Sequence, residues 1–403
     1  MRNFCFLAAM GIAISLQQSA AQVVVTRKPL DASTSFKPIS VPGITTSLPK
    51  SVLLSAPDVA ALLAQDAKQT SGPTRFARAL PVQIDFRSGK WETTEKGRVW
   101  RCVVEASKAH SLHFLFQKLS LPDSAKLYIY NLDQSLVIGP IQKDNLTNGT
   151  FATDLISGSS AVLELFEPAE SSGKSDLLVN RVYYGYKPIF VETGFGSSGS
   201  CNVNINCSAG NNWQAQSNGV CVLLTNTNEN SAFCSGTLLN NTCQNFLPNV
   251  LTAFHCLDTG DGVLQQSERD QVANWLFRFQ YKSPTCSPNQ NATNYITFTG
   301  ATFLSAWRNS DFALLRMNQR PQASSGIQYV GWSRTGTTPN SVVCIHHPAG
   351  DVMKIATDGQ SPTVTTITGS ANSHWFVDTW DTGTTEGGSS GSALFDQNGR
   401  VIG

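Results

Sequence analysis

Three short stretches in the second half of the sequence carry residue types that together could perform acyl transfer. "LTAFHC" contains His255, "SDFALLRM" places Asp311 at the head of an apolar run, and "TEGGSSGS" has Ser390 near its centre. A serine nucleophile needs a base that takes its proton and a carboxylate that fixes the tautomer of that base. The sequence offers one candidate for each role, in the order His, Asp and Ser. This set predicts a serine hydrolase that forms a covalent acyl intermediate.

The glycines around Ser390 suggest a second part of the same chemistry. Gly387, Gly388 and Gly391 are more glycines than a plain turn requires. Glycine lets the backbone approach a ligand closely because it has no Cβ. We therefore expect this loop to present backbone N–H groups to a ligand, which in acyl transfer would be the developing oxyanion.

Each of these residues also has an ordinary interpretation. A lone histidine is more often packed or solvated than catalytic, and a lone serine between glycines is most often a turn residue. By the same standard, Asp258 and Asp261 in "LDTGDG" are predicted to lie in a solvated turn. Asp311 differs, because a carboxylate that enters an apolar strand needs a buried partner. The three motifs together favour the catalytic interpretation.

The remaining histidines do not suggest a metal site. His110 and His113 lie three apart on a predicted strand and face opposite sides, so they cannot chelate one metal. His346 and His347 are adjacent in an extended run and have the same limitation. His374 belongs to no motif and is expected to be an ordinary residue. No metal ligand is therefore predicted.

The elements that must position these residues are predicted to be almost entirely strands. Apolar residues alternate with a period of two over about residues 78–190, which predicts an antiparallel β-sandwich. A second set of strand-like runs begins near residue 196 and carries the three motifs, so the predicted fold class is all-β. Residues 22–77 are predicted to be a linker, and residues 22–54 of it are rich in Ser, Thr and Pro. One short helix is expected in it, capped by Ser55, with an apolar face made of Val59, Leu62 and Leu63.

Composition and the N-terminal residues indicate an exported protein. Residues 1–21 combine Arg2, an apolar run and small residues up to Ala21, which is typical of a secretory signal peptide. No later segment has the apolar length to span a membrane. The net charge of +1 and the charged fraction of 14% give no basic face for nucleic acid. Ten cysteines in an exported chain favour disulfides over zinc ligands.

In its second domain the sequence resembles the chymotrypsin-fold serine proteases, and more narrowly the bacterial lysyl endopeptidase group. The matching pieces occur in order over residues 196–403: "GSCN", "CSGTLLNNT", "LTAFHC", "SDFALL", "IHHP" and "TEGGSSGS". The resemblance implies a double β-barrel in which His255 is the general base, Asp311 orients it and Ser390 is the nucleophile. It also implies that the backbone N–H groups of Gly388 and Ser390 hold the oxyanion.

The same resemblance implies some disulfides and leaves others open. It pairs four cysteines, namely Cys234 with Cys256 and Cys207 with Cys286. It gives Cys201 a partner near the C-terminal end of the domain, and the sequence has no cysteine there. The pairing of three further residues stays open: Cys221, Cys243 and Cys344.

Departures from the family pattern bear on specificity and activation. The sequence ends shortly after Ser390, which predicts a truncated domain with an incomplete second barrel and an open strand edge. Thr384 stands where trypsin-like enzymes hold the Asp that selects basic side chains, so cleavage after lysine rests on family analogy. Ser389 stands where animal zymogens hold an Asp that pairs with a new N-terminus, so activation is predicted not to use that ion pair. The match to "GSCN" implies maturation near Gly196.

The predicted protein is thus a secreted, monomeric serine endopeptidase that hydrolyses protein or peptide substrates through an acyl-enzyme on Ser390, without a cofactor. The β-sandwich is predicted to be a prodomain that folds with the protease or shields it. The alternative is an inactive fragment whose sandwich is a binding or folding-assistance module.

Overall fold

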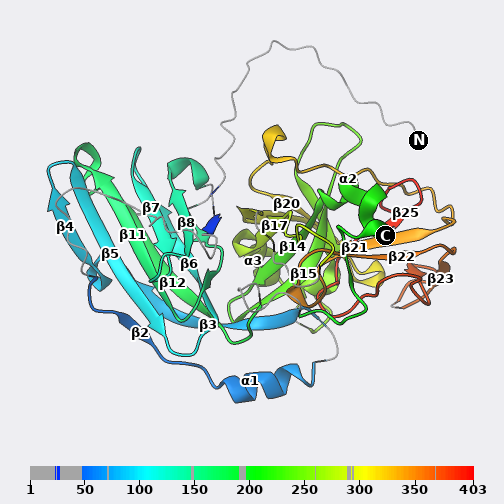
Figure 1. Cartoon of the computed structure of the whole chain (residues 1–403), viewed down its shortest axis with the longest axis horizontal. Coiled ribbons are helices and arrows are strands. Elements are labelled where there is room, and N and C mark those ends of the chain that lie inside the picture. Colours follow the sequence, from blue (N-terminus) through cyan, green and yellow to red (C-terminus); the bar gives the residue numbers. More distant parts are fainter. Residues whose placement is uncertain are drawn as a thin grey trace, which may run out of the picture.

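The computed structural model describes residues 23, 25–27, 48–69, 72–146, 149–189, 197–258, 260–287, 292, 295–367 and 369–403. The predicted signal peptide over residues 1–21 and the predicted maturation point near Gly196 lie outside the described residues. Strands dominate the described chain, which confirms the all-β prediction (Figure 1). No helix in these ranges is long and apolar enough to cross a membrane.

The alternating apolar residues of the N-terminal half form two facing sheets with a common core. One sheet has the order β1-β8-β7-β11-β5-β2, with β4 paired to β5. Its strands are β1 (Val25–Arg27), β2 (Val52–Leu54), β4 (Lys90–Thr94), β5 (Gly97–Ala106), β7 (Lys126–Tyr130), β8 (Leu136–Ile141) and β11 (Ser160–Pro168). The facing layer consists of β3 (Thr74–Ile84), β6 (Ser111–Ser120), β9 (Phe151–Ala152), β10 (Ile156–Ser157) and β12 (Asp176–Gly185). Trp100, Phe114 and Leu163 are among the fully buried side chains between the layers.

The predicted linker over residues 22–77 contains two strands of the sandwich. β2 pairs in parallel with β5, and β1 pairs antiparallel with β8, so each strand extends one edge of the first sheet. β3 also begins at Thr74, inside the predicted linker. These short edge strands lack the alternation that marks a strand in the sequence, because three residues are too few for a period of two to be visible.

The short helix is present, but its cap differs from the prediction. α1 spans Val59–Asp66, and the carboxylate of Asp58 accepts a hydrogen bond from Ala61 N at 2.9 Å. Asp58, rather than Ser55, therefore satisfies one of the open N–H groups of the first turn. Leu62 is the buried residue of the predicted apolar face.

The C-terminal half forms a chymotrypsin-like pair of β-structures. In the first, the pairing runs β18-β17-β14-β15-β16-β20-β19. These strands are β14 (Val220–Asn226), β15 (Asn230–Leu239), β16 (Asn249–Ala253), β17 (Leu276–Phe279), β18 (Ile296–Thr299), β19 (Ala301–Trp307) and β20 (Phe312–Met317). The second is a sheet with the order β13-β22-β21-β25, whose strands are β13 (Val203–Asn204), β22 (Lys354–Asp358), β21 (Val342–His346) and β25 (Leu394–Asp396).

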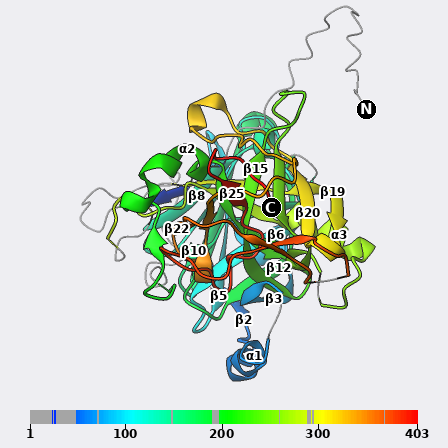
Figure 2. The same ribbon diagram turned by 90° about the vertical axis from the view of Figure 1, so that its right-hand side faces the viewer.

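Smaller elements complete this half of the molecule. A hairpin is formed by β23 (Thr363–Thr365) and β24 (His374–Phe376), and two short helices are α2 (Gln214–Ser217) and α3 (Gln266–Gln271). Figure 2 views the molecule from the end that carries β22 and β25. Each β-structure has its own apolar core: Leu223 and Phe277 belong to one, and Ile345 and Phe395 to the other.

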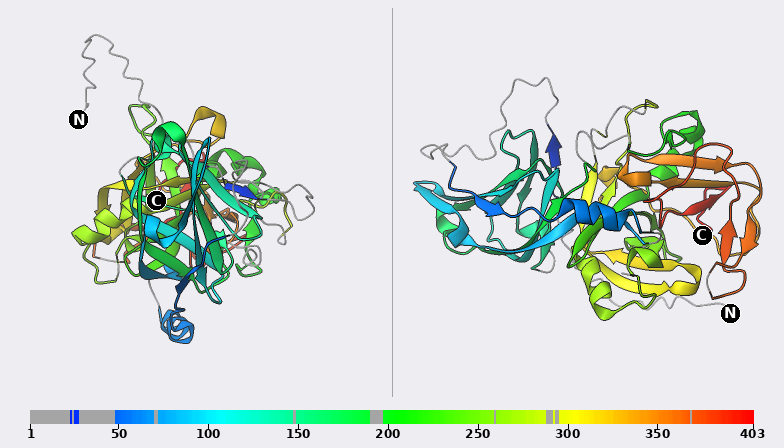
Figure 3. Two further views of the ribbon diagram at one scale, coloured as in Figure 1. Left: turned by 90° about the vertical axis from the view of Figure 1, so that its left-hand side faces the viewer. Right: turned by 90° about the horizontal axis from the view of Figure 1, so that it is seen from below.

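The two halves are joined through β3, which the sequence did not indicate. β3 pairs with β12 of the sandwich along one edge and with β15 of the first barrel along the other. The pairing with β15 matches Thr74 with Phe233 and Arg78 with Asn230. Seen from below in Figure 3, the strand bridges the two halves and α1 lies across their junction. One layer of the sandwich and the first barrel therefore form one continuous sheet.

Candidate active site

His255 is held at the end of a strand that is tied to its neighbour. It lies in a single 3-10 turn (Phe254–Cys256) that follows β16 directly. The next residue, Cys256, forms a disulfide with Cys234 in β15. The turn is thus fixed both by the sheet pairing of the strand before it and by a covalent bond.

Asp311 meets His255 because of the register between β16 and β20. Ala253 pairs with Phe312, and one step further the carbonyl of Asp311 accepts a hydrogen bond from Phe254 N at 2.9 Å. The Asp311 carboxylate then accepts two bonds from His255: Oδ1 from the backbone N at 3.0 Å and Oδ2 from Nδ1 at 2.6 Å. Because the carboxylate is the acceptor, Nδ1 carries the proton and Nε2 is left as the basic nitrogen.

The partner expected for Asp311 is therefore His255, although the pair is not deeply buried. About a third of each side chain is exposed, 34% for His255 and 36% for Asp311. Asp311 also adopts a left-handed backbone conformation with φ 51°, at the end of a 3-10 turn. Asp tolerates this conformation better than most residues, since its short polar side chain can bond locally.

The loop that carries Ser390 forms a type II turn over Glu386–Ser389. Ser389 N donates to the carbonyl of Glu386 at 2.9 Å, and Gly388 has φ +97° at the position where this turn type needs a positive φ. A Cβ on Gly388 would also lie 2.4 Å from Cε2 of Phe233. Conformation and packing therefore both require glycine there.

Each carbonyl from Gly387 to Ser390 accepts a hydrogen bond from within the protein. The carbonyl of Gly387 accepts from Ala349 N at 2.6 Å and that of Ser389 from Ser392 N at 3.0 Å, while Ser235 donates to the carbonyls of Gly388 and Ser390 at 3.0 and 2.7 Å. In a trans peptide the N–H points away from the preceding carbonyl. Among the described residues, neither Gly388 N nor Ser390 N donates a hydrogen bond. Two N–H groups are thus left for a ligand.

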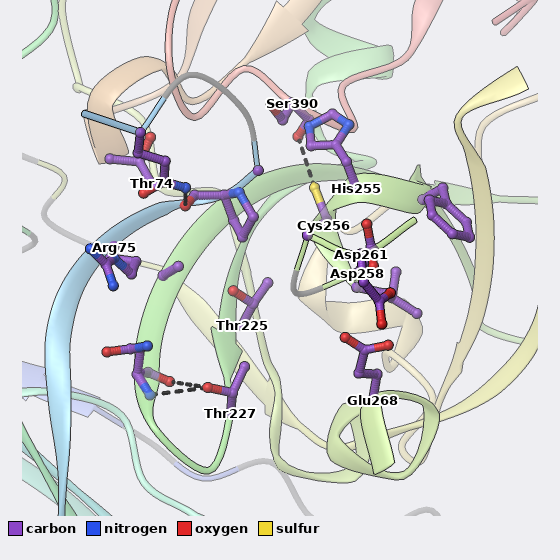
Figure 4. Close-up of a pocket in the computed structure, with 18 of the residues that line it drawn as sticks. Thr74, Arg75, Thr225, Thr227, His255, Cys256, Asp258, Asp261, Glu268 and Ser390 are labelled. Atoms are coloured by element: carbon purple, nitrogen blue, oxygen red, sulfur yellow. Dashed lines mark hydrogen bonds between the residues drawn. The ribbon is translucent and has the colours of Figure 1, made fainter. Parts of the chain in front are cut away.

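Ser390 lies beside His255 at one end of a cleft (Figure 4). The cleft has a volume of about 1500 Å³, and His255, Asp311 and Ser390 all line it. The structure thus brings the three predicted residues together. The nearby Cys256 Sγ, 3.8 Å from the carbonyl of Ser390, is part of a disulfide and carries no proton, so this is a packing contact.

The wall of the cleft also contains residues that sequence reasoning did not assign to the site. Asp258 and Asp261, predicted to lie in a solvated turn, line the cleft while their carboxylates accept from Gly262 N and Val263 N. His374, predicted to be ordinary, lines it as well. No signal in the sequence marks these residues, because only the folding of distant loops brings them to the cleft.

The opposite wall comes from the N-terminal half, from the end of α1 to the start of β3. Thr74 and Arg75 line the cleft, and the Oγ1 of Thr74 lies 3.1 Å from the position that a Cβ on Gly387 would occupy. Asp66, at the end of α1, holds this segment through ion pairs with Arg75 (2.5 Å) and Lys187 (2.7 Å). Burial raises the pKa of the Asp66 carboxyl, but hydrogen bonds and charge from Lys187 and its other partners bring the pKa below its usual value.

Two disulfides lie in the C-terminal half of the described chain. Cys207–Cys286 and Cys234–Cys256, the two pairings implied by the resemblance, are both present. Cys201 is exposed and forms no disulfide within the described ranges. No group of three or more His, Cys, Asp or Glu residues that could hold a metal ion occurs in the part of the chain that the structure describes.

Comparison with known proteins assigns the molecule to a family. The double β-structure defines a chymotrypsin-like protease fold. The family described as lysyl endopeptidase, C-terminal domain, matches residues 195–403, which is just over half of the chain. The chain therefore belongs to this family.

Individual relatives extend the match beyond that domain. A lysyl endopeptidase of Pseudomonas aeruginosa is 29% identical over 328 residues, which cover 77% of this chain and 68% of the relative. The secreted RxLR effector protein 73 of Plasmopara viticola is 27% identical over 319 residues, 72% of each chain. Among solved structures, an HtrA-type protease with a tripeptide has a TM-score of 0.33 at 17% identity, covering 49% of this chain and 53% of its own. Deg5 has a TM-score of 0.31 at 15% identity, and the match covers 47% of this chain and 80% of Deg5.

Proposed function

We propose that this protein is a serine endopeptidase in which Ser390 is the nucleophile, His255 the general base and Asp311 the residue that orients the base. The observation that carries the proposal is the pair of hydrogen bonds from His255 to the Asp311 carboxylate, with Ser390 beside the imidazole. Membership of the lysyl endopeptidase family supports the same reaction.

The mechanism follows from the protonation that this geometry favours. With Nδ1 bound to Asp311, His255 Nε2 takes the proton of Ser390 as Oγ attacks the scissile carbonyl. The developing oxyanion is held by the N–H groups of Gly388 and Ser390, neither of which donates a hydrogen bond within the described residues. The imidazolium then protonates the leaving amine. In the second half of the reaction, His255 takes a proton from water as the water attacks the acyl-enzyme, and the serine is regenerated. No cofactor enters these steps.

The substrate is proposed to be a protein or peptide cleaved after lysine. The support for lysine is the name of the matched family and of the Pseudomonas relative. Thr384, which precedes the serine loop, offers a hydroxyl rather than a carboxylate to a basic side chain. The acid that would select lysine is therefore not assigned to a residue. We also propose that the protein is secreted, as its two disulfides favour an oxidising compartment. Its proposed oligomeric state is a monomer.

The N-terminal sandwich over residues 78–190 is proposed to be a prodomain that assists folding of the protease domain at 196–403. The support is the pairing of β3 with β15, together with a buried cluster that contains Phe76 and Tyr183 of one half and Val222 and Phe233 of the other. The alternative, an inactive molecule whose sandwich is a binding module, would share this interface but would not need an ordered serine loop.

A fluorophosphonate probe tests the proposed reaction. The purified protein should be labelled on Ser390, and Ser390→Ala should abolish labelling without changing the thermal midpoint. Ser324→Ala, an exposed serine away from the cleft, is the matched control and should be labelled like the unchanged protein. A well-folded sample that is not labelled would refute the serine mechanism.

A further inference from the structure

A buried histidine contacts the residue that precedes Ser390. His346 ends β21 and is fully buried, and its Nδ1 lies 2.7 Å from Oγ of Ser389. Ser389 is itself 7% exposed. Neither residue has a role in the reaction proposed above.

The other contact of the hydroxyl leaves its proton free for this hydrogen bond. Ser389 Oγ accepts a hydrogen bond from Glu386 N at 3.1 Å. The hydroxyl can then donate its proton to Nδ1 of His346, which requires a neutral ring with its proton on Nε2. Burial lowers the pKa of His346 to about 3, with smaller contributions from the nearby His347 and Lys354. This pKa agrees with a neutral ring near neutral pH.

The Ser389 hydroxyl thus connects both ends of the type II turn to a rigid strand. Ser389 is the last residue of the turn, and its Oγ contacts both the backbone N of Glu386, the first residue of the turn, and Nδ1 of His346 in β21. β21 is in turn held by β22 on one side and β25 on the other. This attachment fixes the turn whose third residue is Gly388.

The neighbouring residue anchors the other side of the same loop. His347 N donates to Ser235 Oγ at 3.0 Å, and Ser235 Oγ donates to the carbonyl of Gly388 at 3.0 Å. Two consecutive residues of the "IHHP" motif therefore support the loop, one through a side chain and one through the backbone.

We propose that His346 is a positioning residue, which accepts a hydrogen bond from Ser389 and thereby holds the Glu386–Ser389 turn with the N–H of Gly388 facing the cleft. This proposal rests on the proposed function in so far as that N–H serves the oxyanion. It gives the loop a support inside the uncleaved chain, so that no ion pair with a newly formed N-terminus is needed. The histidine acts only through Ser389 and does not touch the substrate.

The test compares two substitutions of nearly the same shape. His346→Asn keeps an acceptor close to the position of Nδ1, whereas His346→Leu removes it. We expect His346→Leu and Ser389→Ala each to lower kcat and the rate of fluorophosphonate labelling by about 10- to 100-fold, the size expected for a displaced oxyanion donor, with KM changed by less than about threefold. His346→Asn should retain most of both rates. The double variant His346→Leu/Ser389→Ala should be no slower than the slower single variant.

Two further measurements separate this proposal from the proposed function. The ¹⁵N shifts of His346 should show a proton on Nε2 and none on Nδ1, whether or not the protein hydrolyses peptides. A crystal structure of the His346→Leu variant should show the turn reoriented, with Gly388 N no longer facing the cleft. A proton on Nδ1, an unchanged turn, or equal rates for the Leu and Asn variants would each overturn the positioning role. A lack of labelling in the unchanged protein would instead overturn the proposed function.

Discussion

Asp154 of the sandwich and Arg278 of the first barrel form an ion pair in which both side chains are buried. The carboxylate also accepts hydrogen bonds from Thr297 Oγ1 at 2.6 Å and from Leu155 N at 2.7 Å. Burial alone would raise the pKa of Asp154, but the charge of Arg278 and these hydrogen bonds bring the pKa below its usual value. A charged pair therefore lies inside the junction between the two halves, where removal of one partner leaves the other charge buried without its ion pair.

Removal of one member of this pair should be costly. Asp154→Asn is expected to destabilise the protein by about 3–5 kcal/mol, because Arg278 would remain charged and buried. The double variant Asp154→Leu/Arg278→Met should be much closer to the unchanged protein, since it removes both charges. Urea unfolding at neutral pH measures both values. A single variant no less stable than the double variant would contradict this account.

Buried histidines should make the protein lose stability in mild acid. Burial lowers the pKa of His113 and His347 to about 4 and that of His346 to about 3. Below the ordinary value of 6.5, the unfolded chain takes up protons that the folded protein does not. The free energy of unfolding should therefore fall as the pH drops from 6.5 towards 4, by up to about 1.4 kcal/mol per pH unit for each histidine.

One substitution isolates the contribution of a single histidine. His113 Nε2 lies 3.0 Å from Asn226 Oδ1, and a glutamine amide could donate at the same place. A plot of the free energy of unfolding against pH should be less steep for His113→Gln, by up to the contribution that the preceding paragraph gives for one histidine. His110→Gln, at an exposed position, is the matched control and should leave the slope unchanged. Thermal midpoints at pH 7, 6 and 5 check the prediction, and identical slopes for all three proteins would contradict it.

The two halves should stay together after a single cut between them. A specific cleavage site inserted between Ile189 and Ser197 would sever the chain but leave the β3–β15 pairing and the shared core intact. We expect both pieces to elute as one complex in neutral buffer and to separate in denaturant. Phe76→Asp, which puts a charge into the shared core, should promote separation. Free elution of the unmodified pieces in neutral buffer would disprove this prediction.

Gly388 should be intolerant of a side chain for two reasons. Its φ is +97°, and an added Cβ would lie 2.4 Å from Phe233 Cε2. Gly388→Ala should therefore slow fluorophosphonate labelling by about 10²- to 10³-fold, as expected for the loss of an oxyanion donor. Gly336→Ala is the matched control, because Gly336 also has a positive φ of +71° but open space around it. Equal labelling of the two variants would exclude the proposed role of Gly388 N.

The sequence was sufficient for the fold class and for the three residues that meet in the cleft. His255, Asp311 and Ser390 each lie in a motif whose neighbours in the chain fix their local geometry, so the motif predicts the site. The two disulfides also followed from the resemblance. These features depend on short segments, which is why they are visible in one sequence.

What the sequence did not indicate depends on pairing between distant segments. The role of β3 as a strand shared by both halves could not be predicted, because its alternation specifies a strand but not its partners. Asp258 and His374 reached the cleft through loop conformations that leave no pattern. Likewise, the contact between His346 and Ser389 joins the end of β21 to a distant turn, and the two adjacent histidines alone gave no reason to expect it.

The shared strand also limits how the two halves can be exchanged. Where β3 pairs with the edge of β15, the backbone of one half supplies the hydrogen-bonding partners of the other. Side chains also pack across this edge, as the ring of Phe76 does against that of Phe233. A sandwich taken from a distant relative would have to reproduce both the register and this fit. The molecule is thus poorly suited to modular recombination, and substitutions on either side of the seam must be compatible with the other side.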